Sequence, residues 1–156
     1  MVNAAWLTER IEAANRIFRP LDVCFEARAP RALPDRHARL MTRADRDALT
    51  DLMVPDAINV FVVRRLRDVD DPSLDRMGVH WHGKKGARYV ILEYDAMRTS
   101  LAHELGHYFG NPAHTTIRNN VMSYDRPDED RLTFTRAQTD RIRAEVRRLR
   151  RAGSRR

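Results

Sequence analysis

Residues 87–109 narrow the choice of fold sharply, because a strand there runs straight into a helix. Residues 87–95, ARYVILEYD, form an apolar run rich in β-branched and aromatic side chains, which predicts a strand. Residues 96–109 then predict a helix, with Asp95 as its N-cap and Gly110 where a left-handed residue would end it. Its apolar stripe is formed by Met97, Leu101, Leu105 and Phe109. A strand and a helix in this order indicate an α/β fold, in which helices cover a sheet.

The other expected elements surround this unit. They are a helix ending before Pro20, a strand over residues 22–30, a short helix over 43–53, a buried strand over 57–66, an edge strand over 78–83 and a last helix from a capping box at Thr135 and Gln138 to Gly153. At 156 residues the chain has the length of a single domain, so we expect one twisted mixed sheet with helices packed on it. The single cysteine, Cys24, excludes an internal disulfide, and its place in the expected strand predicts a buried thiol.

The excess positive charge lies at the C-terminal end. The chain carries 29 basic and 22 acidic side chains, a net charge of +7. Residues 141–156 hold eight of the arginines and one acid, Glu145, so the first 140 positions hold 21 basic and 21 acidic residues. A solvated helix end accounts for such a charge run, and weak binding of a polyanion is the alternative. The neutral body of the chain argues against a protein built to bind nucleic acid.

The expected helix contains a short motif that suggests a metal site. It reads His103-Glu104-Leu105-Gly106-His107. Two histidines four residues apart project from one face of a helix, so both imidazoles can reach one tetrahedral zinc ion. The glutamate directly after the first histidine points beside such an ion, which suits a general base that takes a proton from zinc-bound water. The simpler interpretation is an amphipathic helix with two surface histidines.

Three features beyond the motif favour the metal site. Gly110 ends the helix three residues after His107, so the chain can turn back. His114 follows shortly, as a third imidazole would. Eight residues later, Met122 lies in a tight polar segment that could pass beneath the metal. Together they predict a site closed by the chain after the helix.

These residues resemble a known family. The stretch HELGHYFGNPAH followed by NNVMSY is similar to the extended zinc motif and Met-turn of the metzincin peptidases, and it is most similar to their pappalysin branch. The resemblance implies a zincin-type catalytic domain over residues 1–153, with residues 154–156 as a basic disordered tail. It also implies a zinc-dependent endopeptidase, in which a glutamate activates a zinc-bound water to hydrolyse peptide bonds.

The resemblance further implies a role for each residue of the site. The zinc ligands would be His103, His107 and His114. Glu104 would be the general base and later the acid. Met122 would form the hydrophobic floor beneath the zinc, and Tyr124 would approach the metal or the oxyanion of the tetrahedral intermediate.

One spacing departs from the family's pattern. Metzincins have two residues between the glycine and the third histidine, whereas Asn111, Pro112 and Ala113 make three here. A bulge at Pro112 could absorb the extra residue, because proline already prevents regular helix there. Alternatively, His114 misses the metal and another group or a water completes the site. The chain also lacks the cysteines and the longer loop before the Met-turn of pappalysins, so their calcium sites are not expected.

His80 and His82 alternate on one face of the expected edge strand. Two histidines without a third partner are more often exposed side chains than a second metal site. In metzincins such an edge strand lies along the cleft, so the stretch could pair with an extended peptide by strand addition.

Two other functions are compatible with the sequence. A zinc-stabilised binding module without catalysis would use the same histidines, and the arginine-rich C-terminus would suit a nucleic-acid-associated protein. The leading interpretation implies a peptide or protein substrate and favours a monomer, although the sequence leaves the oligomeric state open. No apolar run is long enough to span a membrane. Residues 1–18 have an acidic amphipathic pattern unlike an export signal, so we expect a protein that stays inside the cell or the mature part of a longer precursor.

Overall fold

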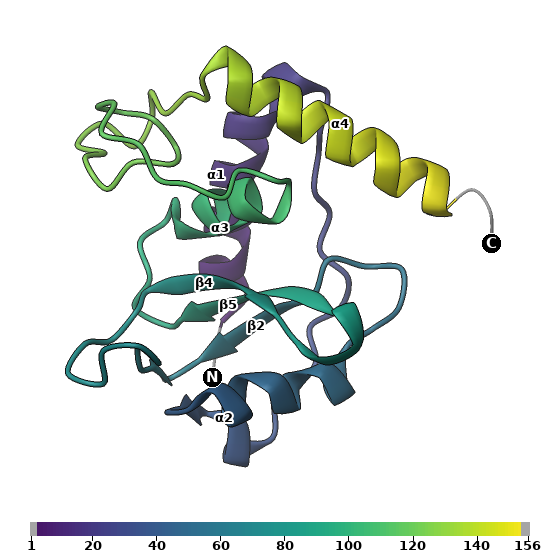
Figure 1. The fold of residues 1–156 in the computed structure, drawn as a ribbon, viewed down its shortest axis with the longest axis vertical. Helices are drawn as coiled ribbons and strands as arrows, with labels where there is room; N and C mark the ends of the chain where they lie inside the picture. Colours follow the sequence, from purple (N-terminus) through teal and green to yellow (C-terminus); the bar gives the residue numbers. More distant parts are fainter. Residues whose placement is uncertain (1–2, 154–156) are drawn as a thin grey trace.

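The computed structural model describes residues 3–153, and these form four α-helices and two small β-sheets (Figure 1). The helices are α1 (Ala4–Phe18), α2 (Arg43–Asp47), α3 (Ser100–Tyr108) and α4 (Arg136–Gly153). The strands are β1 (Arg39–Leu40), β2 (Val60–Val63), β3 (Arg65–Leu66), β4 (Gly78–His82) and β5 (Arg88–Glu93). Short 3-10 helices occur at Arg19–Leu21, Asp35–His37, Ala48–Leu52 and Lys84–Gly86. Helices and strands are interleaved along the chain, which confirms the α/β prediction, while the expected tail at 154–156 lies outside the described residues.

The larger sheet has three strands in the order β2-β5-β4. β2 runs parallel to β5 and β4 runs antiparallel to it, so this sheet is mixed, as expected. The expectation of one sheet is wrong, because β1 and β3 form a separate parallel pair. The main-chain N–H groups of Arg64 and Arg65 both donate to the carbonyl oxygen of Ala38, at 2.8 and 3.2 Å. The expected strand over 57–66 therefore ends at Val63, where the chain changes its partner and joins the other sheet.

The alternation of side chains along the central strand β5 divides the core in two. Val90 and Leu92 pack into the larger cluster with side chains of α1, α3 and α4. Tyr89 and Ile91 pack into a smaller cluster with the segment 39–52. In Figure 1, α1 and α3 accordingly lie on one side of the sheet and α2 on the other. The helix that carries the histidine motif is therefore fixed against the buried centre of the sheet.

Residues 22–30, expected to form a strand, contain no strand in the structure. Instead, the side chain of Asn15 in α1 exchanges two hydrogen bonds with the main chain of Phe25, at 2.7 and 3.0 Å. Val23 is buried against the core, whereas Cys24 is exposed. The prediction of a buried Cys24 is therefore wrong: the hydrogen bonds of this segment go to a helix side chain, and the thiol points away from the core.

α3 begins at Ser100, four residues later than the sequence predicts. The segment just before α3 forms a turn that a side chain of α1 stabilises: Nη2 of Arg10 donates to the carbonyl oxygen of Ala96 at 2.7 Å. Met97 was expected on the apolar stripe but precedes the helix and is 40% exposed, so that expectation is wrong. The rest of the stripe is buried as predicted: Leu101, Leu105 and Phe109.

α4 packs against the larger core cluster through Ile142, which is fully buried. Its first turn has the predicted capping box, in which the Thr135 N–H donates to Gln138 Oε1 at 2.8 Å and the Gln138 N–H donates to Thr135 Oγ1 at 3.3 Å. Arg88 of β5 donates to Glu145 of α4 at 2.7 Å, which ties this helix to the sheet. Within residues 3–153, no helix has both the length and the apolar character needed to cross a membrane.

Candidate metal centre

α3 and the loop after it bring three imidazoles together. His103 and His107 lie one turn apart on α3, and His114 reaches them from the loop. Nε2 of His114 lies 3.1 Å from Nε2 of His103 and 3.2 Å from Nε2 of His107. In the part of the chain that the structure describes, no other group of three His, Cys, Asp or Glu side chains could hold a metal ion. The three histidines lie close enough to bind a single ion.

Main-chain carbonyl groups orient the two helical histidines. Nδ1 of His103 lies 2.7 Å from the carbonyl oxygen of Val121, and Nδ1 of His107 lies 2.7 Å from that of Asn111. Because a carbonyl oxygen can only accept, Nδ1 carries the proton in both rings and Nε2 carries a lone pair. A proton on His114 could satisfy only one of these lone pairs well. A cation between the three Nε2 atoms would satisfy all of them.

The distances between the Nε2 atoms fit a small metal ion. Zinc binds an imidazole nitrogen at about 2.0–2.1 Å, so two ligands of a tetrahedral ion lie about 3.3 Å apart. The observed 3.1 and 3.2 Å are close to that separation. Neutral imidazoles bind zinc and also other first-row metal ions such as copper, iron and nickel. The donor set therefore fits a transition-metal site with room for a further ligand.

Burial favours the neutral form of these histidines. It lowers the pKa of His103 to about 3, and it also lowers the pKa of His107 and of His114. A metal ion binds imidazole through a lone pair, so a ring that is already neutral at pH 7 gives up no proton on binding. The environment of the site thus prepares its three rings as ligands.

The loop after α3 carries His114 to the other histidines despite the extra residue. Gly110 has a φ of +93°, a conformation that favours glycine and that ends the helix as predicted. Asn111 is 1% exposed, and its main-chain N–H and side-chain amide both donate to the carbonyl oxygen of Gly106, at 3.1 and 3.2 Å. This buried asparagine anchors the bend, so Pro112 and the residue after it can lie outside the helix and deliver the imidazole.

Met122 packs against α3 at Gly106. The methionine is fully buried, and a Cβ atom added at Gly106 would lie 2.4 Å from its Sδ. Glycine is therefore required for this close approach. The N–H of Thr115 donates to the carbonyl oxygen of Met122 at 3.0 Å, and Oδ1 of Asn120 accepts from the Met122 N–H at 2.9 Å. The polar segment predicted from the sequence is thus a buried turn packed on the helix of the histidines.

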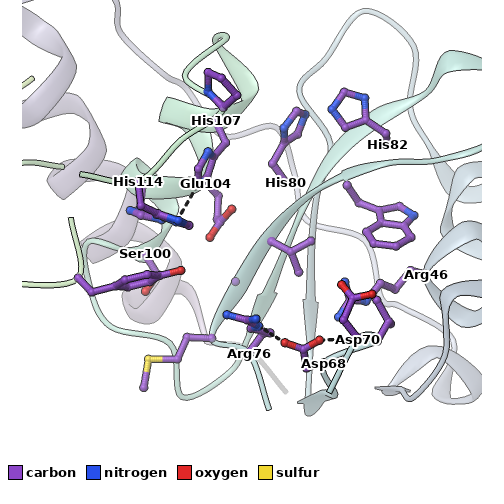
Figure 2. Close-up of a pocket in the computed structure, with 18 of the residues that line it drawn as sticks. Arg46, Asp68, Asp70, Arg76, His80, His82, Ser100, Glu104, His107 and His114 are labelled. Atoms are coloured by element: carbon purple, nitrogen blue, oxygen red, sulfur yellow. Dashed lines mark hydrogen bonds and ion pairs between the residues drawn. The ribbon is translucent and has the colours of Figure 1, made fainter. Parts of the chain in front are cut away.

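Glu104 is buried between α3 and the edge strand β4 (Figure 2). Its carboxylate accepts a hydrogen bond from the main-chain N–H of His80. Gly78 makes room for it, because a Cβ there would lie 2.9 Å from Glu104 Cγ. Burial raises the pKa of Glu104 to about 7, against the opposing effects of the His80 N–H and of nearby arginines. A carboxyl group with this pKa can both accept and donate a proton near neutral pH.

The histidines and Glu104 line one cleft of about 840 Å³ between α3 and β4 (Figure 2). His80 and His82 line it from β4, with ring centroids 4.6 Å apart. His82 is exposed, whereas burial lowers the pKa of His80 to about 3. Among the described residues, none forms a hydrogen bond with the buried Nε2 of His80. The expectation of two exposed histidines is therefore correct for His82 only.

Two further side chains from the loop after Met122 line the cleft. Tyr124 is 67% exposed, and its ring centroid lies 4.4 Å from that of His114. Arg126 lines the same cleft but was missed in the sequence, because no pattern marks an arginine in a polar loop as pointing inward. Its placement depends on how the loop folds, including Asn119 with a φ of +54°.

Comparison of the chain with models of known protein families finds no match, and comparison with curated proteins finds none. The class of site that the structure defines is a cleft with three convergent histidines and a buried carboxyl group. The resemblance to metzincins rests on the residues of the two motifs.

Proposed function

We propose that this chain is a zinc-dependent endopeptidase of the metzincin type. The observation that carries the proposal is the convergence of three imidazole Nε2 atoms, with separations of 3.1 and 3.2 Å, in the cleft that also holds a buried carboxyl group. In this proposal the ion is held by His103, His107 and His114. When bound, zinc supplies a Lewis acid that acidifies water and polarises the carbonyl group of the scissile bond.

Glu104 acts as the general base and then as the general acid. It accepts a proton from the attacking water and passes it to the nitrogen of the departing amine. Burial raises the pKa of Glu104 in the metal-free site to about 7, so this environment favours uptake of a proton by the carboxylate. The N–H of His80 holds the carboxylate on the β4 side of the cleft, so the main chain sets its orientation.

The substrate pairs with the open edge of β4. The Glu93 N–H donates to the Met77 carbonyl oxygen at 2.9 Å, so the odd-numbered residues of this strand pair with β5. The main-chain groups of the even-numbered residues therefore point away from β5: Gly78, His80 and His82. The His80 N–H is taken by Glu104, so a peptide can meet the His80 carbonyl oxygen and the groups of Gly78 and His82. An extended peptide that adds to this edge lies along the cleft, with its main chain beside Glu104.

Tyr124 stabilises the negative charge that develops on the carbonyl oxygen. A phenol donates a hydrogen bond to an oxyanion, and this ring lies beside His114 at the rim of the cleft. Its large exposure leaves the side chain able to turn toward a bound substrate.

The proposal is tested with the zinc-loaded full chain, casein and a mixed peptide library. The wild-type protein is expected to cleave internal peptide bonds. The matched variant Glu104→Gln keeps the shape of the side chain but removes the base, so it should bind zinc normally while cleavage falls by about 10²–10⁴-fold. Metal analysis of both proteins accompanies the assay.

Two results would overturn the proposal. Equal cleavage by Glu104→Gln and by the wild-type protein would remove Glu104 from the reaction. Stoichiometric zinc binding without cleavage of any peptide would instead favour a zinc-stabilised binding module.

A further inference from the structure

The loop after residues 120–124, the methionine segment, places an arginine in the cleft. Arg126 lines it together with Glu104, His114 and Tyr124. Its Nε and Nη1 atoms are buried, and no residue in the described part of the chain accepts a hydrogen bond from either atom. Burial lowers the pKa of Arg126, and the nearby Glu129 and Glu104 oppose that effect only in part. Burying guanidinium N–H groups without acceptors costs free energy, so binding of an anion by this side chain would be favourable.

Two acidic residues of this loop, Glu129 and Asp130, are paired with another arginine. Glu129 accepts a hydrogen bond from Nε of Arg98 at 3.2 Å, and Asp130 accepts one from Nη2 of the same arginine at 2.9 Å. Arg98 lies just before α3, outside the lining of the cleft. The hydrogen bonds of these two carboxylates therefore go to Arg98, and Glu129 acts on Arg126 only through its charge.

A second guanidinium lies close to the same carboxyl group. Arg76 precedes β4, and its Nε forms an ion pair with the buried Asp68 (Figure 2). Both Arg76 and Arg126 act to lower the pKa of Glu104, so both lie near its carboxylate. Asp68 pairs with Arg76, whereas no described residue accepts a hydrogen bond from Nε or Nη1 of Arg126, so Arg126 has donors free for a further anion.

The topology places these arginines on one side of the bond to be cleaved. The start of β4 pairs with the end of β5, and β5 leads into α3. Arg76 lies just before β4. Arg126 lies near Glu129, whose carboxylate accepts a hydrogen bond from Arg98 just before α3, so both arginines belong to this end. A peptide that adds antiparallel to β4 runs from His82 toward Gly78. Its residues after the cleaved bond therefore approach Arg126.

We propose that Arg126 binds a carboxylate of the substrate on the C-terminal side of the cleaved bond. Substrates with an acidic side chain or a free α-carboxylate there are therefore preferred. A carboxylate fits because its two oxygens match the N–H donors of a guanidinium group and satisfy donors that the fold leaves unpaired. This inference rests on the proposed peptidase function.

The test uses the zinc-loaded full chain and three peptides that share one neutral sequence. The first has Glu after the cleaved bond and an amidated end, the second has Gln and an amidated end, and the third has Gln and a free α-carboxylate. The first or the third peptide should exceed the second in kcat/KM by about tenfold or more. A preference for the first identifies a side-chain carboxylate, and a preference for the third identifies the chain end.

Variants of Arg126 test whether this side chain causes the preference for the carboxylate peptides. Arg126→Gln should abolish it, Arg126→Glu should reverse it in favour of a Lys-containing peptide, and Arg126→Lys should retain part of it. Arg131→Gln is the matched control, because this arginine belongs to the same loop but its side chain is 84% exposed. Equal kcat/KM for the three peptides, or a preference that persists in Arg126→Gln, overturns the inference.

A binding measurement separates this inference from the peptidase proposal. In the Glu104→Gln background, fluorescence anisotropy with labelled versions of the three peptides gives their Kd values. Tighter binding of the carboxylate peptides, lost on adding Arg126→Gln, supports the inference even when the wild-type protein cleaves nothing. Equal Kd values for all three peptides overturn it, whatever the result of the cleavage assay.

Discussion

Asn120 and Gln138 exchange two side-chain hydrogen bonds, 2.9 and 3.2 Å long, between the methionine segment and the first turn of α4. Both side chains are buried. Asn120 also accepts from the N–H of Met122, and Gln138 also accepts from the N–H of Thr135. The turn that packs under the histidine helix and the cap of the last helix are thus held by one pair of amides.

Gln138→Ala should lower the free energy of unfolding by about 1–3 kcal/mol, because it leaves the buried amide of Asn120 without its partner. Urea unfolding, followed by circular dichroism, measures the change. Asp140→Asn is the control: it lies on the exposed side of the same helix and should alter the free energy by less than about 0.5 kcal/mol. Equal effects of the two substitutions would show that the amide pair is not a structural link.

His114→Ala should weaken zinc binding by more than about 100-fold. Loss of a group that only hydrogen-bonds to a ligand weakens binding by about 10–100-fold, and loss of a ligand should cost more. Competition with a chromophoric chelator measures the zinc Kd. His82→Ala removes another histidine of the same cleft and should leave the Kd unchanged. If His114→Ala binds zinc as tightly as the wild-type protein, another group or a water completes the site.

Gly106→Ala should destabilise the protein by about 1–3 kcal/mol, because the new methyl group would meet the sulfur of Met122. The sign of this change in stability is informative, because in a helix without the contact alanine would stabilise the protein by about 1 kcal/mol relative to glycine. The double variant with Met122→Ala should recover part of the loss, and a double-mutant cycle of unfolding free energies measures the coupling. Additive effects would contradict the contact.

Glu104→Gln should stabilise the metal-free protein at pH 8 but not at pH 4.5. Burial raises the pKa of Glu104 from its ordinary 4.5 to about 7, so between these values the folded state binds a proton that the unfolded state does not. Stability from this group is present below pH 4.5 and is lost as the pH rises through 7, a change of about 3 kcal/mol. Urea unfolding in the presence of a chelator gives the free energy of unfolding of both proteins at each pH. The advantage of the variant over the wild-type protein should be larger at pH 8 than at pH 4.5. A constant difference would place the carboxyl group in a less buried environment.

The strand β5, the edge strand β4 and the histidine motif on a helix could be predicted because each depends on a local pattern of side chains. The structure of the segment around Phe25 could not be predicted, because a sequence pattern for extended chain does not identify the groups that accept and donate its hydrogen bonds. Here the side chain of Asn15 takes the place of a strand. The alternation of Val23, Cys24 and Phe25 was nevertheless visible, and it would have placed the thiol on the outer side.

Within the site, the predictable part ends where the chain leaves the helix. The pattern predicts the face shared by His103 and His107, because it follows from the period of the helix. The approach of His114 depends on the buried side chain of Asn111 and on a left-handed Gly110, and only the glycine carries a recognisable signal. The inward direction of Arg126 depends on a loop without regular structure, so no sequence period encodes it.

The two carbonyl groups that orient the helical histidines differ in how far along the chain they lie. The carbonyl of Asn111 is four residues from His107, while that of Val121 is 18 residues from His103. The orientation of His107 can therefore form as soon as the helix ends, whereas that of His103 waits for a long loop to close. Opening of this loop would withdraw His114 and also the carbonyl partner of His103, so metal affinity would depend on closure of the loop as well as on the ligands.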